Sequence, residues 1–211
     1  MMQQLTRIAV KVGSNVLTRR DGTLDVTRMS ALVDQIAELH KQGVEVILVS
    51  SGAVASGRSE VSAIRKLDSV DQRQLYSAVG QAKLINRYYE LFREHGIPVG
   101  QVLTMKESFS TRRHYLNQRN CMMVMLENGV IPIVNENDTV STHEIAVGDN
   151  DTLGAIVAVS MKADLLVLLS DIDGLYTADP HKSENAELIS VVEEITPEIE
   201  SLGGGKGSSL G

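Results

Sequence analysis

The chain has 211 residues, of which 43% are apolar and 22% charged, a composition that excludes a disordered or fibrous protein. Its net charge of −7 and pI near 5.2 argue against a broad surface for nucleic acid or for an anionic membrane. Cys121 is the only cysteine, and no apolar run approaches the roughly 18 residues that span a bilayer. We therefore expect a soluble, cytoplasmic protein without internal disulfides, with no nucleic-acid or membrane partner.

The first predicted element is a short buried strand over residues 7–12, followed by a turn that begins at Gly13. Lys11 is the anomaly in this strand. A lysine inside an apolar run either reaches water at a sheet edge or lies at the carboxyl end of the strand, where open α/β sheets bind ligands.

A packing helix is predicted over residues 26–42 and a second strand over residues 44–49. This strand leads directly into a run of small residues that includes Ser51 and Gly52. Small residues let a ligand approach the backbone closely, and the serine hydroxyl can donate or accept a hydrogen bond. A tight turn between strand and helix explains the same segment equally well.

Two helices and a strand are predicted next. Residues 72–95 form a long amphipathic helix, whose aromatic side chains favour a place in the core or in a subunit interface. A strand follows over residues 97–103 and a helix over residues 111–127. The second helix begins with a basic group at Arg112, which is typical of a solvated face.

The most polar stretch of the chain follows a predicted apolar strand over residues 130–134 and leads into a predicted helix over residues 151–162. Its two clusters are Asn135-Glu136-Asn137-Asp138 and Gly148-Asp149-Asn150-Asp151. Polar residues at the end of a buried strand cost desolvation energy unless they hold a ligand or one another. The stretch is therefore a candidate site, with two Asx turns and a helix N-cap as the alternative.

The last predicted strand, over residues 164–169, is continuously apolar, so we expect it to be buried on both faces. It ends at Ser170 and Asp171, which indicate either another site at a strand's carboxyl end or a plain turn. Strands that alternate with helices through the chain predict an α/β fold with a mainly parallel sheet. No compositional break divides the chain, so we expect a single domain over residues 1–211.

The predicted strand ends together supply one lysine, several carboxylates and amides, and glycine backbones, a mixture that suits phosphate handling. The chain has no G-x-x-x-x-G-K-[ST] motif, and its first strand is not followed by G-x-G-x-x-G. These absences argue against a P-loop enzyme and a Rossmann dehydrogenase. No His/Cys cluster has zinc spacing, and Cys121 is a weak candidate for a nucleophile.

Five motifs carry a more specific signal. They are Val10-Lys11-Val12-Gly13-Ser14-Asn15-Val16-Leu17, Val49-Ser50-Ser51-Gly52-Ala53-Val54, Val134-Asn135-Glu136-Asn137-Asp138, Val147-Gly148-Asp149-Asn150-Asp151, and Ser170-Asp171 with Gly174-Leu175-Tyr176-Thr177-Ala178-Asp179-Pro180. In this order they resemble the signatures of the glutamate 5-kinase branch of the amino acid kinase family. The resemblance implies a three-layer α/β/α sandwich of the carbamate kinase-like type. It also implies transfer of the γ-phosphoryl group of MgATP to the side-chain carboxylate of L-glutamate, the first step of proline biosynthesis.

The resemblance implies a role for each matching residue. Lys11 would neutralise the phosphoryl oxygens and Asp151 would orient Lys11, which makes these two the catalytic pair. The matching substrate-binding residues are Ser51, Gly52, Asn135, Asp138, Asp149 and Asn150, with Asp138 as partner of the glutamate ammonium. The matching nucleotide-binding residues are Lys11, Gly13, Ser170 and Asp171. Mg²⁺ would travel mainly on the ATP phosphates, so no protein ligand is named for it.

The resemblance further implies L-proline as a feedback inhibitor, a homodimer or homotetramer, and a downstream γ-glutamyl phosphate reductase as functional partner. In the family a Thr-Gly-Gly-Met-x-Thr-Lys segment supplies a second phosphate-binding lysine, a position that Lys206 does not match. We therefore expect a C-terminally incomplete kinase domain without an RNA-modification-type C-terminal domain. Residues 1–211 alone are expected to turn over weakly or not at all.

Two alternatives stay open on the sequence. One is a kinase of the same family that acts on aspartate, N-acetylglutamate, carbamate or a nucleotide monophosphate. The Asn-Glu-Asn-Asp and Gly-Asp-Asn-Asp pair favours glutamate over these acceptors. The other is a non-catalytic, regulatory module that keeps the amino-acid pocket but does not transfer phosphate.

Overall fold

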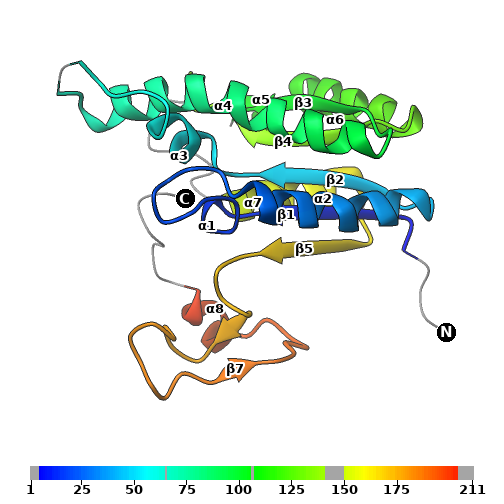
Figure 1. The fold of residues 1–211 in the computed structure, drawn as a ribbon. Coiled ribbons are helices and arrows are strands. Elements are labelled where there is room, and N and C mark those ends of the chain that lie inside the picture. Colours follow the sequence, from blue (N-terminus) through cyan, green and yellow to red (C-terminus); the bar gives the residue numbers. More distant parts are fainter. Residues whose placement is uncertain (1–4, 65, 106, 141–149, 204–211) are drawn as a thin grey trace.

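A parallel five-stranded sheet forms the centre of the molecule, in the strand order β3-β4-β2-β1-β5 (Figure 1). The computed structural model describes residues 5–64, 66–105, 107–140 and 150–203. The strands are β1 (Arg7–Val12), β2 (Glu45–Ser50), β3 (Val99–Thr104), β4 (Ile131–Glu136) and β5 (Leu165–Leu169). All four pairings between them are parallel, which confirms the predicted sheet.

Helices connect the strands, because parallel strands need a crossover connection between them. They are α1 (Ser14–Leu17), α2 (Val26–Lys41), α3 (Ala53–Arg58), α4 (Ser69–Glu94), α5 (Glu107–Ser110), α6 (Arg112–Glu127), α7 (Asn150–Met161) and α8 (Pro197–Leu202). A short antiparallel pair, β6 (Leu175–Tyr176) and β7 (Leu188–Ile189), lies with α8 beyond β5, apart from the main sheet (Figure 1).

The side chains of β2 show how the layers form. Val46 and Leu48 pack in a core with residues of α2 and α4, whereas Ile47 and Val49 pack in a second core with residues of α6 and α7. Successive side chains of a strand point to opposite faces, so the two cores lie on opposite sides of the sheet. The predicted three-layer α/β/α sandwich is confirmed.

Two glycines bring α3 and α4 into close contact. A Cβ at Gly80 would lie 1.8 Å from the carbonyl oxygen of Ala53, and a Cβ at Gly57 would lie 1.8 Å from that of Tyr76. Only glycine permits this approach of two backbones. As α3 directly follows the end of β2, the contact ties α4 to that strand end.

Several predicted boundaries shift. Helix α4 begins at Ser69 rather than at residue 72, because the Asp68 carboxylate accepts a hydrogen bond from the backbone N–H of Asp71 and caps the helix. Strand β4 continues to Glu136, so Asn135 belongs to the strand and not to the loop after it. The side chain of Asn135 is thereby fixed by the sheet.

The prediction that residues 164–169 are buried on both faces is wrong. Leu165 and Leu168 are 43% and 50% exposed. The reason is that β5 is the outer strand of the described sheet and pairs only with β1 there. A continuous apolar run predicts a strand, but it does not predict the position of that strand in the sheet.

Other expectations are met. Tyr88 and Phe92 are fully buried in the core, although Tyr89 on the same helix is 50% exposed. The basic start of α6, at Arg112, is solvated as predicted.

Across the described ranges, the structure contains no helix that is both long and apolar enough to cross a membrane.

Candidate active site

The carboxyl ends of β1, β2 and β5 lie at the same end of the sheet, because β1 pairs in parallel with both neighbours; Figure 1 shows the arrowheads of β2 and β5 pointing the same way. Backbone hydrogen bonds join the turns that follow them. The N–H of Gly13 donates to the carbonyl oxygen of Leu169 at 3.0 Å, and the N–H of Ser51 donates to that of Val12 at 3.0 Å. Segments far apart in sequence therefore meet at the edge where open α/β sheets bind ligands.

Lys11 and Asp151 form an ion pair at this edge, with Nζ 2.5 Å from Oδ1. Lys11 is buried, with 5% of the residue exposed, and lies near the carboxyl end of β1, which has a neighbouring strand on both sides; the alternative of a lysine that reaches water from an outer strand is therefore wrong. Asp151 stands in the first turn of α7, and its side chain is 42% exposed. A buried ammonium needs such a partner, and the exposed side of the carboxylate leaves the pair accessible from solvent.

Glycines leave space around the Lys11 side chain. A Cβ at Gly154 of α7 would lie 3.2 Å from the Cβ of Lys11 and 3.5 Å from its Cγ. The helix therefore rests directly on the aliphatic part of the lysine. At the other end, a Cβ at Gly13 would lie 3.6 Å from Nζ. A phosphate oxygen could approach the ammonium over the bare backbone of Gly13.

A chain of amide hydrogen bonds lies beside this pair. The Nδ2 of Asn150 donates to Oγ of Ser51 at 2.6 Å and to Oδ1 of Asn135 at 3.2 Å. The Nδ2 of Asn135 in turn donates to Oε1 of Gln81, on α4, at 2.8 Å. Ser51 and Asn135 are 8% and 3% exposed. Three residues predicted for substrate binding are thus joined through hydrogen bonds to Asn150.

Asp138 lies near this group but has a partner that the sequence analysis did not foresee. Both Nε and Nη2 of Arg73 contact its Oδ1, at 2.8 and 2.7 Å, and Nη2 also lies 3.4 Å from Oε2 of Glu136. Next to Arg73, the Nε2 of Gln74 donates to the carbonyl oxygen of Thr139 at 2.8 Å. The first turns of α4 therefore hold the segment that follows β4.

Ser170 and Asp171 follow β5 at the same edge and are exposed. The Nδ2 of Asn15, in α1, donates to Oδ2 of Asp171 at 2.9 Å, and Oγ of Ser170 donates to Oδ1 of the same residue at 3.2 Å. The hydrogen bond from Asn15 is the main cause that holds the pKa of Asp171 below its ordinary value. The two predicted nucleotide-binding segments are therefore joined by one side-chain contact.

Two predicted site residues need separate mention. Gly52 has a φ of 102°, a left-handed conformation that lets the chain turn from β2 into α3. Asp149 lies outside the described residues. The predicted site residues with described side chains otherwise gather at one edge of the sheet.

The sequence analysis missed Arg73 and Gln81 and gave no role to Asn15. For Gln81 a signal existed. It follows the buried Ser77 and precedes the buried Leu84 and Tyr88 at helical spacing, so a polar amide occupies the inward face of α4. A polar residue on a buried face needs a hydrogen-bond partner, and here the partner is Asn135.

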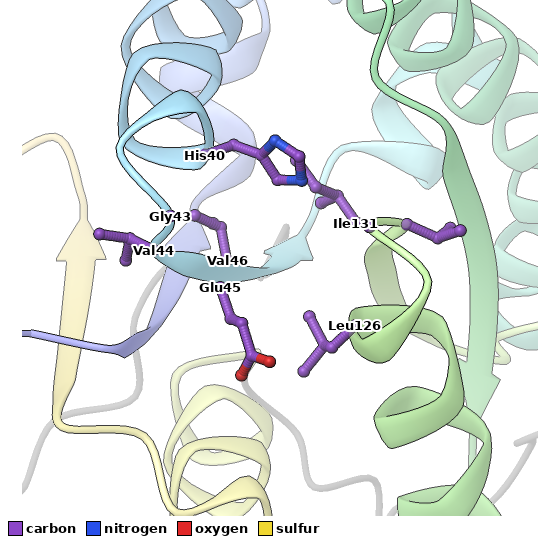
Figure 2. A pocket seen from close by; sticks show the side chains of 9 residues that line it. His40, Gly43, Val44, Glu45, Val46, Leu126 and Ile131 are labelled. Atoms are coloured by element: carbon purple, nitrogen blue, oxygen red, sulfur yellow. The ribbon is translucent and has the colours of Figure 1, made fainter.

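A shallow pocket of about 210 Å³ lies elsewhere, at the amino ends of β2 and β4 (Figure 2). Its lining residues are His40, Gly43, Val44, Glu45, Val46, Leu126, Gly129, Val130 and Ile131. The Glu45 carboxylate is 2.6 Å from Nη2 of Arg7, so it already has a cationic partner. Within the described part of the chain, no group of three or more His, Cys, Asp or Glu residues could hold a metal ion.

Comparisons with known proteins agree with this geometry. The model of the amino acid kinase family matches residues 6–208. A glutamate 5-kinase of Bacteroides thetaiotaomicron is 72% identical over 195 residues, which are 92% of this chain and 53% of that protein. A glutamate 5-kinase of Clostridium acetobutylicum is 45% identical over 210 residues, which are 100% of this chain and 79% of that protein.

Coverage is partial for most of these relatives. A protein named glutamate 5-kinase 2 of Bacillus licheniformis is 47% identical over the whole chain, which corresponds to 57% of its length. The chain thus spans little more than half the length of several curated relatives it matches.

Among solved structures, isopentenyl phosphate kinase has a TM-score of 0.63 at 18% identity, with 94% of this chain and 83% of that chain covered. This likeness concerns the fold alone. With the parallel sheet, the lysine–aspartate pair at its carboxyl edge and a family match over residues 6–208, the chain belongs to the amino acid kinase family, and its relatives named above are glutamate 5-kinases.

Proposed function

We propose that this chain acts in the ATP-dependent phosphorylation of the L-glutamate side chain to γ-glutamyl phosphate. The observation that carries the proposal is the ion pair of Lys11 and Asp151 next to the hydrogen-bonded group of Ser51, Asn135 and Asn150, of which Ser51 and Asn135 are buried. A cation for phosphate and a polar pocket for an amino acid lie side by side. The names of the relatives supply glutamate as the acceptor.

On the phosphate side, Lys11 is the residue that meets the transferred group. Asp151 fixes the ammonium, and Gly13 leaves the space next to Nζ open. The glutamate carboxylate is already ionised near pH 7, so the reaction needs no general base. The task of the protein is to align the reactants and to neutralise charge, which is what a fixed ammonium does.

On the acceptor side, we assign glutamate to Ser51, Gly52, Asn135, Asp138, Asp149 and Asn150. The Asp138 carboxylate is the proposed partner of the glutamate ammonium, and any ammonium bound there shares the carboxylate with Arg73. Ser170 and Asp171 with Gly13 are the proposed start of the nucleotide site. Mg²⁺ is assigned to the ATP phosphates, where it would neutralise part of their charge.

The remaining proposals concern the surroundings of the enzyme. An acyl phosphate is labile, so a reductase that consumes γ-glutamyl phosphate is the proposed functional partner in proline biosynthesis. We further propose feedback inhibition by L-proline, a homodimer or homotetramer, and a cytoplasmic location, with which the single cysteine agrees.

The experiment that tests the function is acyl-hydroxamate formation by the complete natural protein from ATP and hydroxylamine, with glutamate, aspartate and N-acetylglutamate as acceptors. We expect hydroxamate to form with glutamate and not with aspartate or N-acetylglutamate. Lys11→Met should reduce kcat roughly 1,000-fold, since it removes a fixed charge at the phosphoryl group. Lys41→Met, which changes an exposed lysine at the end of α2, is the matched control and should leave kcat unchanged.

Three outcomes would count against the proposal. Signal with aspartate or N-acetylglutamate in place of glutamate would reassign the acceptor within the family. Tight glutamate binding without hydroxamate would indicate a regulatory module. An unchanged kcat in Lys11→Met would remove the lysine from the chemistry.

A further inference from the structure

Gln81 of α4 ends the chain of hydrogen bonds that runs through Asn135 and Asn150 to Ser51. We propose that Gln81 is a positioning residue that decides which end of the Asn150 side chain faces the substrate. This inference rests on the proposed function and adds to it a residue that determines how the amino acid is recognised.

The argument begins with the symmetry of an asparagine side chain. Its amide has an oxygen that accepts hydrogen bonds and a nitrogen that donates two, and the two ends have nearly the same shape. A buried asparagine can therefore occupy the same space in two orientations, and only its hydrogen-bond partners select one. Asn135 is 3% exposed, so protein groups and not bulk water make that selection.

Gln81 supplies the selecting group. Its Oε1 accepts a hydrogen bond from Nδ2 of Asn135 at 2.8 Å. This turns Oδ1 of Asn135 toward Asn150, whose Nδ2 donates to it at 3.2 Å. If Asn135 were reversed, its nitrogen would face the nitrogen of Asn150, and two donors would oppose each other.

The effect on Asn150 follows directly. Its Nδ2 carries two hydrogens, and these are directed to Oγ of Ser51 at 2.6 Å and to Oδ1 of Asn135 at 3.2 Å. The group that Asn150 can still offer a ligand is its carbonyl oxygen. A hydrogen-bond acceptor suits the α-ammonium group of an amino acid and does not suit a carboxylate.

The packing of α4 fixes the position of Gln81. It lies one turn beyond Ser77 and one turn before Leu84, both of which are buried. The adjacent Gly80 lets α4 approach the backbone of Ala53, next to Ser51 and Gly52. Helix α4 is thus fixed against the same strand end that carries the acceptor for Asn150.

The test compares two substitutions of similar size in the complete natural protein. Gln81→Met keeps the length of the side chain but removes the acceptor, whereas Gln81→Glu keeps an acceptor at the same place. Gln35→Met, at an exposed position of α2, is the matched control. We measure kcat and KM for glutamate and for ATP, and kcat/KM for glutarate, which lacks the ammonium group.

We expect Gln81→Met to raise the KM for glutamate roughly 10-fold, since one hydrogen bond to a charged group is weakened. The kcat, the KM for ATP and the kcat/KM for glutarate should stay within about twofold of wild type. Gln81→Glu should retain most of the affinity for glutamate. A role in packing alone would change all these parameters together and would lower the melting temperature in parallel.

Equal KM values for glutamate in wild type and Gln81→Met would overturn the inference, and so would an equal loss in Gln81→Met and Gln81→Glu. Absence of turnover with glutamate in the wild type would instead overturn the proposed function. In that case titration calorimetry with glutamate decides separately, because the inference still requires weaker binding by Gln81→Met. No binding of glutamate to the wild type would overturn both.

Discussion

Arg73 and Asp138 are joined through two guanidinium nitrogens, which lie 2.8 and 2.7 Å from the same carboxylate oxygen. The pair connects the first turns of α4 with the segment after β4, and the side chain of Asp138 is only 10% exposed. A partly buried carboxylate at the proposed glutamate site is therefore oriented by the protein itself.

Loss of this pair should destabilise the protein. We expect Arg73→Gln to lower the free energy of unfolding by about 1–2 kcal/mol, because it leaves Asp138 and Glu136 without their shared cation. The measurement is urea denaturation. Arg87→Gln on the same helix removes an exposed pair with Glu90 and should change the free energy by less than about 0.5 kcal/mol. Equal effects of the two substitutions would show that the contact of Arg73 with Asp138 stabilises the fold no more than an exposed ion pair does.

Gly154 provides a test of the proposed catalytic role of Lys11. A methyl group there would press on Cβ and Cγ of Lys11, at 3.2 and 3.5 Å, so Gly154→Ala should displace the ammonium. We expect kcat to fall roughly 10-fold or more, while the preference of helices for alanine, about 1 kcal/mol, limits the loss of stability. Ala155→Ser, at the exposed neighbouring position, should leave kcat unchanged. A fully active Gly154→Ala variant would mean that α7 or the lysine adjusts without cost.

Asn15 provides a test of the contact between the two proposed nucleotide-binding segments. Asn15→Ala removes the hydrogen bond to Asp171, and we expect the KM for ATP to rise about 3- to 10-fold while the KM for glutamate stays constant. Steady-state kinetics with each substrate varied in turn measures both. Asn86→Ala removes a comparable exposed contact on α4 and serves as the control. A rise in the KM for glutamate instead would place Asn15 in the acceptor half of the site.

Tyr88 predicts a pH dependence of stability. Its hydroxyl lies 2.9 Å from Oγ of Ser50 in the core, and burial raises the pKa of this phenol above its ordinary value of 10.0. The stability that the neutral phenol provides is complete below pH 10, since the unfolded chain ionises first as the pH rises. The free energy of unfolding of the wild type should therefore fall above pH 10, by about 1.4 kcal/mol for each pH unit.

Tyr88→Phe isolates this contribution. At pH 8 the variant should be less stable than wild type by about 1 kcal/mol, because the hydrogen bond between Ser50 and the phenol is lost. Between pH 10 and 11.5 the difference should shrink or reverse in urea denaturation, since phenylalanine cannot ionise. Tyr89→Phe, at a half-exposed position, should show no such convergence. Parallel curves for wild type and Tyr88→Phe would contradict the prediction.

The sequence predicted the sheet well because each strand is a short apolar run bounded by glycine or polar residues. The strands at residues 7–12 and 131–136 are found within a few residues of the expected positions. It did not predict that β5 is half exposed, because the order of strands depends on long-range packing. The pair β6 and β7, with two residues each, is too short to leave a periodic pattern.

The candidate site, too, was predictable from the sequence only in part. Lys11 and Asp151 stand out in sequence because a charge in an apolar strand and an acid at a helix start are local anomalies, and the structure pairs them. Arg73 and Gln81 make contacts with residues that lie 65 and 54 positions away in the sequence. A helical pattern shows which face is buried but not which distant side chain meets it, so these partners required the structure.

Arg73, Gln81 and Tyr88 all project from α4 onto residues at or just after the carboxyl ends of β4 and β2, namely Asp138, Asn135 and Ser50. They are spaced by about two helical turns each, so all three contacts depend on the helical register of α4 between these residues. An insertion or deletion of one residue between Arg73 and Tyr88 would rotate the following part of the helix by roughly 100°. At least one of the three side chains would then no longer reach its partner. Length variation among natural sequences should therefore fall before residue 69 or after residue 94 and spare the segment between Arg73 and Tyr88.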